Sequence, residues 1–282
     1  FMTGIGGGGV EAAVNSLISR MYSDTRVYSL NLMHMFFGVG AFTWPAVAGW
    51  LLASGYSWRV LYYIVGGFSI AVALMLLPQK FPDSGGEDTV GLRDMLRMLG
   101  NPTVLLVGLV TAFYVGGEMG INNWIVRYFD EVLLHGKSLP ETLGVRAAVT
   151  SSIFLTLYWL SMTVGRVGAT IAGRVMSDTA LLRVMTLCST VFAVATFLVS
   201  DVIAAAVLLG LPGLFFSGIF ATAIAAGGNR FPGRLGIISG IVIAFSGLGN
   251  VGFSTAIGGI AEAAGLRAGL LFAAGMLGLM TL

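Results

Sequence analysis

The chain has 282 residues, of which 56% are hydrophobic and only 10% are charged, with a mean hydropathy of +0.91. Its apolar residues form long blocks and do not alternate with polar ones, which indicates an all-α polytopic membrane protein. The net charge is +2 and the basic residues are scattered, so no nucleic-acid partner is expected. The single cysteine, Cys188, lies in an apolar segment, which excludes a disulfide framework and a cysteine–histidine metal cluster.

The apolar blocks predict about nine helices that cross a hydrocarbon core roughly 30 Å thick. We therefore expect an integral multi-pass protein of a plasma membrane or a bacterial inner membrane, with the lipid bilayer as a partner. In chain order, the predicted spans are Phe1–Ile18, Leu30–Ala53, Val60–Leu77, Val104–Val126, Ser152–Ile171, Val184–Val199, Ile203–Ala226, Ile237–Ile260 and Leu266–Leu282.

A polar segment, residues 79–101, separates the first three predicted spans from the last six. Leucines at positions 92, 96 and 99 recur at helical spacing while Arg93, Asp94 and Arg97 occupy the other face, which predicts a short amphipathic helix at the membrane interface. If this linker is cytoplasmic, most of the arginines and lysines in the loops fall on the cytoplasmic side, as the positive-inside rule requires.

An internal repeat relates the two blocks. A Phe-x-Gly-x-Gly motif that begins at Phe36 recurs at Phe245, and Gly49 and Gly258 follow the two motifs at the same offset. The short block thus matches the last half of the long one, as in major facilitator transporters, whose six-helix halves are built from three-helix units. Because the chain also begins at Phe1 without an initiator methionine, we expect three further helices before it. Chance glycine matches are the alternative explanation.

Four stretches resemble the fucose, glucose and galactose symporter branch of the major facilitator superfamily. Two contain isolated acids, the glycine-rich stretch from Gly4 to Asn15 and Tyr114-Val-Gly-Gly-Glu118 with the residues up to Trp124. The others are Leu30 to Ala41, which contains His34, and Tyr158-Trp159 with the residues up to Arg166. They are similar, in this order, to the fourth, seventh, fifth and eighth helices of the family.

The resemblance implies helices 4 to 12 of a twelve-helix transporter. Residues 1–78 would be the remainder of the N-terminal bundle, 79–101 the cytoplasmic linker and 102–282 the C-terminal six-helix bundle. It implies alternating access and symport of a monosaccharide with a proton or a sodium ion, no other cofactor, and a monomer when full length. Bacterial members typically have Gln where this chain has His34, which leaves the coupling ion open. The alternatives are an exporter or uniporter of another small organic solute, and a non-transporting scaffold or truncated relic.

Glu118 is the strongest candidate from the residues themselves, because it is the only charge in Val104–Trp124. A charged side chain at bilayer depth costs about 2.5–3.5 kcal/mol on insertion scales, so it usually faces a protein interior or a water-filled path. Glu11 is a second acid within an apolar span, with Asn15 four residues later on the same helical face. Both acids are predicted to couple ion binding to transport. The alternative is that each only hydrogen-bonds a neighbouring helix.

Polar side chains near these acids are predicted to bind the substrate. Asn31 and His34 lie three residues apart and share a helix face, and Asn122 follows Glu118 by about one turn. Trp124 offers a flat apolar face on which a sugar ring can stack. For His34 the alternative is an interhelical hydrogen bond, and for Trp124 it is a place in the aromatic belt at the membrane interface. The predicted substrate-binding set is Asn31, His34, Glu118, Asn122 and Trp124.

Three charged residues surround the loop that follows the predicted span Ser152–Ile171. Arg166, Arg174 and Asp178 are predicted to latch the cytoplasmic side, and the alternative is that they are ordinary residues of a cytoplasmic loop. Gly4 to Gly9 also fits the dinucleotide-binding pattern G-x-G-x-x-G, but no strand precedes it. The loops contain no Ser/His/Asp or Cys/His constellation, so no enzyme activity and no metal site are expected.

Overall fold

A computed structural model describes residues 2–22, 25–80, 92–135, 151–173, 175–231 and 234–281. Every regular element within these ranges is a helix, which confirms the predicted all-α class. Six helical segments of the described chain are long and apolar enough to cross a membrane, by length and composition. They are Tyr28–Ala53, Trp58–Leu76, Pro102–Leu133, Asp178–Leu198, Val202–Gly228 and Gly236–Ala264.

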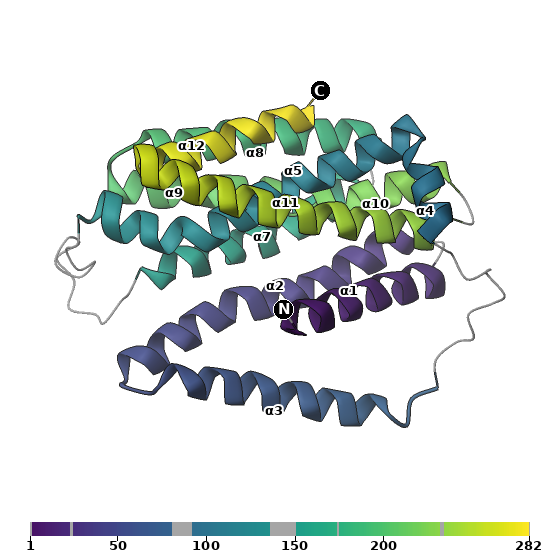
Figure 1. Ribbon diagram of the computed structural model, residues 1–282, viewed down its shortest axis with the longest axis horizontal. Helices are drawn as coiled ribbons and strands as arrows, with labels where there is room; N and C mark the ends of the chain where they lie inside the picture. The colour runs from purple at the N-terminus through teal and green to yellow at the C-terminus, as the bar shows by residue number, and fades with distance from the viewer. Residues whose placement is uncertain are drawn as a thin grey trace.

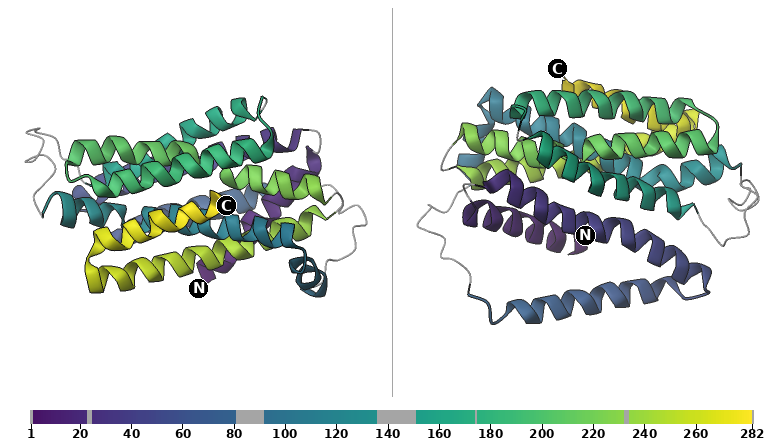
Figure 2. Two further views of the ribbon diagram at one scale, coloured as in Figure 1. Left: turned by 90° about the horizontal axis from the view of Figure 1, so that it is seen from above. Right: turned by 180° about the vertical axis from the view of Figure 1, so that it is seen from behind.

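Three helices at the start of the chain form one side of the molecule: α1 (Met2–Met21), α2 (Arg26–Ala53) and α3 (Trp58–Leu76). In Figure 1 they lie below the remaining helices, with α2 nearest to them and α3 farthest away. The view from behind in Figure 2 shows the same separation. The α3 helix begins after Ser57, whose side chain accepts a hydrogen bond from the Arg59 amide. No residue of α3 is buried. Thus α2 supplies most of the contact between the two sides.

The linker region contains α4 (Leu92–Leu99), where the sequence predicts a short helix. Met98 is buried, whereas Leu96 of the predicted apolar face is exposed. After it, α5 (Pro102–Arg127) begins at Asn101, whose side chain accepts a hydrogen bond from the Thr103 amide at 2.9 Å, with Pro102 in the first turn. The helix continues as one π-helical segment, η2 (Tyr128–Leu133). The division into residues 1–78, 79–101 and 102–282 stays a prediction.

The rest of the chain folds into α7 (Ser152–Ala172), α8 (Asp178–Leu198), α9 (Val202–Phe216), α10 (Ile219–Arg230), α11 (Leu235–Ala264), α12 (Leu266–Leu277) and the short 3-10 helix η3 (Gly278–Thr281). The predicted span Ile203–Ala226 is therefore two helices, α9 and α10. They are separated at Ser217 and Gly218, where a Cβ on Gly218 would meet Ala169 and Met185. Close packing of neighbouring helices at this point, which the sequence does not reveal, accompanies the break.

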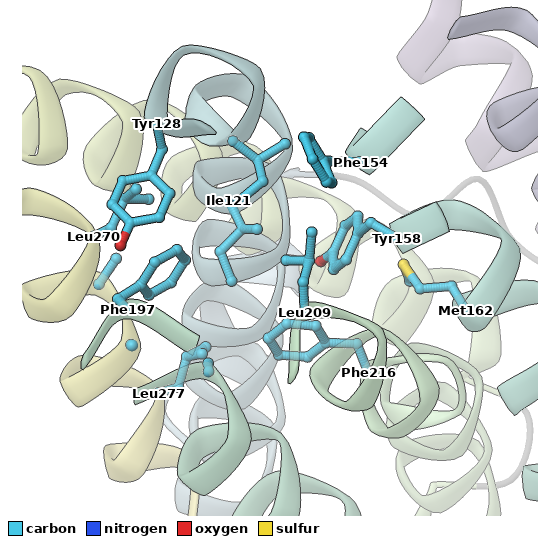
Figure 3. Packing of buried hydrophobic residues seen from close by; sticks show 14 of the residues in the cluster. Ile121, Tyr128, Phe154, Tyr158, Met162, Phe197, Leu209, Phe216, Leu270 and Leu277 are labelled. Atoms are coloured by element: carbon cyan, nitrogen blue, oxygen red, sulfur yellow. The ribbon is translucent and has the colours of Figure 1, made fainter. Parts of the chain in front are cut away.

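The buried members of the main hydrophobic core all lie in the part of the chain that follows the linker, and Ala41 and Phe42 of α2 pack against them. The buried members lie between residues 114 and 280, and Figure 3 shows them converging from several helices. Phe129 stacks on Phe154 with ring centroids 3.6 Å apart, and Tyr128 meets Phe197 edge to face at 5.2 Å. A smaller cluster joins Leu30 of α2 to residues of α4, α5, α10 and α11.

Glycine determines the close approach of α5 and α11. A Cβ on Gly249 would collide with the backbone of Ala112, whereas Gly247, slightly earlier on the same helix, faces open space. In the matching repeat the roles are exchanged, because Gly38 lies against Thr163 and Arg166 of α7 while Gly40 is unhindered. Small residues allow membrane helices to pack backbone to backbone, so the two copies of the motif use different glycines for contact.

We predict that Gly249→Val destabilises the protein because the added methyl groups meet the backbone of α5. Overpacking of this kind costs about 1–3 kcal/mol, which should lower the midpoint of thermal unfolding in detergent. Gly247→Val is the matched control, since the same side chain is added on the same helix where nothing is nearby. Equal midpoints for the two variants would contradict this account of the α5–α11 contact.

Candidate functional site

Glu118 is buried in the middle of α5, with only 5% of its surface exposed. Tyr114 lies one turn earlier on the same helix, and its side chain interacts with the Glu118 carboxylate. Tyr158 of α7 donates to the backbone carbonyl of Glu118 at 3.5 Å. Glu118 thus has two tyrosines as neighbours, one from its own helix and one from α7.

Two other charged residues act on Glu118 through space. The guanidinium of Arg166 attracts its negative charge, and the carboxylate of Glu11 opposes it. Arg166 is itself only 5% exposed, whereas the Glu11 side chain on α1 is exposed. The structure therefore brings Glu11, Glu118 and Arg166 from α1, α5 and α7 within electrostatic reach of one another, although they are far apart in sequence.

Arg166 also joins α7 to α2. It donates a hydrogen bond from a terminal nitrogen to the backbone carbonyl of His34, and its guanidinium lies 5.9 Å from the centre of the Phe37 ring. Its Nε is buried and has no hydrogen-bond partner among the described residues. The sequence predicts Arg166 as part of a cytoplasmic latch, and the structure places it within α7, between the acid and the contact of the two helix groups.

His34 is linked to α1 through Asn15. Its Nε2 lies 3.2 Å from the Asn15 Oδ1, and the Asn15 amide donates to the backbone carbonyl of Glu11 at 2.9 Å. Asn15 is almost completely buried, and the His34 ring meets Phe220 of α10 edge to face at 5.6 Å. The described hydrogen bond of the His34 ring is thus interhelical.

Asn122 belongs to a chain of hydrogen bonds that crosses three helices. The Trp159 indole of α7 donates to Asn122 Oδ1 at 2.7 Å, and Asn122 donates to Asn123 Oδ1 at 3.0 Å. Asn123 then donates to Ser254 Oγ of α11 at 3.1 Å, and Ser254 donates to Asn250 Oδ1 at 3.5 Å. Each group donates to the next, so the orientation of the Asn122 amide is set by its neighbours at both ends.

The other predicted residues lie elsewhere or outside the described part of the chain. Trp124 packs over Gly258 of α11, and the Arg127 guanidinium lies 5.6 Å from its ring centre. Asp178 is the first residue of α8, on a different helix from Arg166. The side chain of Asn31 and the whole of Arg174 lie outside the described residues. Within the described ranges, no three His, Cys, Asp or Glu side chains come together as metal ligands.

Sequence reasoning does not single out Tyr114, Tyr158 or Trp159 as functional residues. Tyr114 lies four residues before Glu118, and this spacing alone indicates a shared helix face. No comparable signal exists for Tyr158 and Trp159, because their place beside α5 depends on how α7 packs.

We predict that Arg166→Ala weakens the packing of α2 on α7, because the variant removes the hydrogen bond from the guanidinium to the His34 carbonyl. A hydrogen bond of a charged group contributes about 1.5–3 kcal/mol, so the unfolding midpoint should fall. Arg183→Ala removes an exposed arginine from α8 and should leave the midpoint nearly unchanged. Similar midpoints for both variants would argue against a structural role of Arg166 at this contact.

Comparison with known sequences identifies a family. Residues 1–182 match the sequence model of the Major Facilitator Superfamily. Protein TsgA of Escherichia coli O157:H7 (strain EC4115 / EHEC) is 22% identical over 280 residues, which cover 98% of this chain and 67% of that protein. Protein TsgA of Shigella flexneri is 23% identical over 280 residues, which again cover 98% of this chain and 67% of that protein.

Solved structures show the same fold. A crystal structure of the fucose:proton symporter FucP of E. coli superposes with a TM-score of 0.72 at 17% identity. The match covers 96% of this chain and 72% of that one. A bacterial homologue of the human lysosomal transporter Spinster, in an inward-facing conformation, gives a TM-score of 0.58 at 17% identity, with coverage of 95% and 72%.

Proposed function

Because this chain belongs to the Major Facilitator Superfamily of membrane transporters, we propose that it carries a small polar solute, a monosaccharide, by symport with an ion. The resemblance to the fucose:proton symporter over 96% of the chain supports a sugar as the solute and a proton as the ion. In this superfamily the substrate binds near the middle of the membrane, between two groups of helices that rock about it. Alternating access of that kind is the mechanism we propose here.

The observation that carries the proposal is the environment of Glu118. A carboxyl group that is buried in an apolar bundle, beside Tyr114 and attracted by Arg166, can hold or release a proton without leaving its place. Its charge acts on Arg166, and Arg166 is bonded to the backbone of α2. Protonation of Glu118 thus removes an attraction on the residue that joins the two helix groups. Proton binding at Glu118 can in this way shift the equilibrium between two arrangements of the helix groups.

The surroundings of Glu118 favour a proton over a sodium ion. A hard cation needs several oxygen ligands, which unwound backbone carbonyls often supply in transporters. Here Glu118 lies in the unbroken part of α5, whose carbonyls are used within the helix, and the nearby guanidinium of Arg166 repels a metal cation. A proton needs only the carboxyl group itself.

Sugar recognition is assigned to the polar groups near this acid. Asn122 retains one amide hydrogen and one oxygen lone pair beyond its bonds to Trp159 and Asn123, so it can donate to one sugar hydroxyl and accept from another. Such paired donor and acceptor groups suit hydroxyls better than they suit carboxylates, which only accept. His34 and Asn31 remain proposed contacts, and Trp124 is the weakest of the set because its ring packs against α11.

We predict that Glu118→Gln abolishes sugar accumulation driven by a proton gradient, because the amide cannot carry the proton. The test is uptake of labelled fucose, glucose and galactose into proteoliposomes that contain the full-length protein, under imposed proton or sodium gradients. Glu262→Gln, which changes an exposed acid near the end of α11, should transport normally. Unchanged gradient-driven uptake by Glu118→Gln would remove this residue from coupling, and acceleration by sodium alone would refute proton coupling.

We also predict that Tyr114→Phe slows uptake more than Tyr158→Phe does. The Tyr114 side chain interacts with the Glu118 carboxylate itself, one turn away on the same helix. Tyr158 reaches only the backbone carbonyl, at the long distance of 3.5 Å. Initial uptake rates at a fixed proton gradient measure the difference, and the reverse order would show that the phenol beside the carboxylate is not important for coupling.

A further inference from the structure

An apolar groove runs along the contact of α7 and α9 on the outside of the six-helix part. It has a volume of about 620 Å³ and is distinct from the site around Glu118. One wall includes Leu157, Leu160 and Val164 of α7, and the other includes Ile203 and Val207 of α9, all of which are exposed. Of the described residues that line the groove, none is charged.

The groove offers nothing to a polar solute. Ser161 is the one polar side chain among the described residues of its lining, and its hydroxyl donates to the backbone carbonyl of Tyr158 at 2.8 Å. Gly210 lies opposite on α9, and its missing side chain leaves the groove deep, since the nearest atom to a Cβ there would be the Ser161 Cβ at 3.9 Å. A long, thin hydrocarbon fits such a space.

The length of the groove matches one leaflet of a bilayer. It runs from Ile153 to Val164 on α7 and from Val202 to Leu214 on α9. At a rise of 1.5 Å per residue these segments are about 17 and 18 Å long. Half of a hydrocarbon core of roughly 30 Å is about 15 Å. The groove therefore begins at one membrane surface and ends near the midplane, where an acyl chain also ends.

The open end of the groove carries charges of both signs. Asp201 precedes α9 and is exposed, while Asp130 accepts a hydrogen bond from Ser151 just before α7. Arg267 reaches the same corner and donates to Ser200 Oγ at 3.1 Å. A head group with both an amine and a phosphate complements these residues, whereas a purely anionic head group would face the two carboxylates.

We propose that the groove binds one acyl chain of a phospholipid with an amine-bearing zwitterionic head group. The lipid comes from the leaflet that meets the N-terminal ends of α7 and α9, the ends opposite to the linker. The chain fills the space between the helices down to Ser161 and Gly210, and the amine lies by Asp201. This site is independent of the solute and of the coupling ion.

The experiment uses the full-length protein in vesicles that contain phosphatidylethanolamine with a photoreactive acyl chain. Unlabelled lipid is added in excess before irradiation, and labelled peptides are identified by mass spectrometry. We expect label to persist in residues 153–164 and 202–214 and to be lost from the exposed face of α8 at Val184, Leu187 and Val191, where ordinary boundary lipid exchanges quickly. Equal loss from all segments would overturn the proposal.

Matched variants test the groove itself. Gly210→Phe should fill it and reduce the persistent label several-fold, because the ring occupies the space of the acyl chain. Gly168→Phe adds the same side chain on an open part of α7 outside the lining and should leave the label unchanged. Persistent label in Gly210→Phe, or a dimer in which a second copy of the chain covers α9, would also refute lipid binding here.

The head-group preference has its own test. Asp201→Asn removes the charge but retains an acceptor for the Ala204 amide, which Asp201 now bonds at 2.7 Å, so α9 keeps its cap. With photoreactive phosphatidylethanolamine and phosphatidylglycerol of equal chain length, the unchanged protein should favour the former. Asp201→Asn should reduce that preference. An unchanged preference would refute the role of Asp201, and a preference for phosphatidylglycerol in the unchanged protein would refute the assigned lipid class.

Discussion

The burial of Glu118 and Arg166 is the constraint on which the arrangement of the helices depends. Both side chains are 5% exposed in a chain with very few charges, and a buried charge is tolerated only with partners. Glu118 interacts with Tyr114 of the same helix, and Arg166 donates a hydrogen bond to the His34 carbonyl of α2. The charges act on each other between α5 and α7. Their satisfaction therefore depends on α7 lying against both α5 and α2.

The contact between the two sides of the molecule is polar as well as apolar. Arg166 of α7 donates to the backbone of α2 across this contact, and Asn15 joins His34 to α1 on one side of it. The buried members of the large apolar core all come from the other side. Interhelical hydrogen bonds in membranes contribute modestly, on average about 0.6 kcal/mol each. A contact with few such bonds and a small apolar cluster can rearrange without disruption of the six-helix core. This arrangement suits a protein whose two sides move relative to each other.

The polar site and the proposed lipid groove lie on different faces of α7. The inner face of α7 carries Tyr158 and Arg166 toward α5 and α2, and its outer face lines the apolar groove shared with α9. A lipid chain in that groove would pack against a helix that also holds the site. The backbone of α7 thus separates a polar environment on one side from a hydrocarbon one on the other.

The sequence by itself determined the all-α membrane class, most of the helical segments and the isolated acid Glu118, because hydropathy, segment length and a lone charge are local properties. Tertiary structure decided which side chains meet. Helix packing brings Arg166 beside α2, places the Tyr158 ring beside α5 and forms the hydrogen-bond chain from Trp159 to Asn250. No periodic pattern in a single sequence predicts these contacts. The break between α9 and α10 has the same origin, since Gly218 matters only because Ala169 and Met185 lie against it. Two copies of one glycine motif likewise use different residues for contact, because each faces a different neighbour.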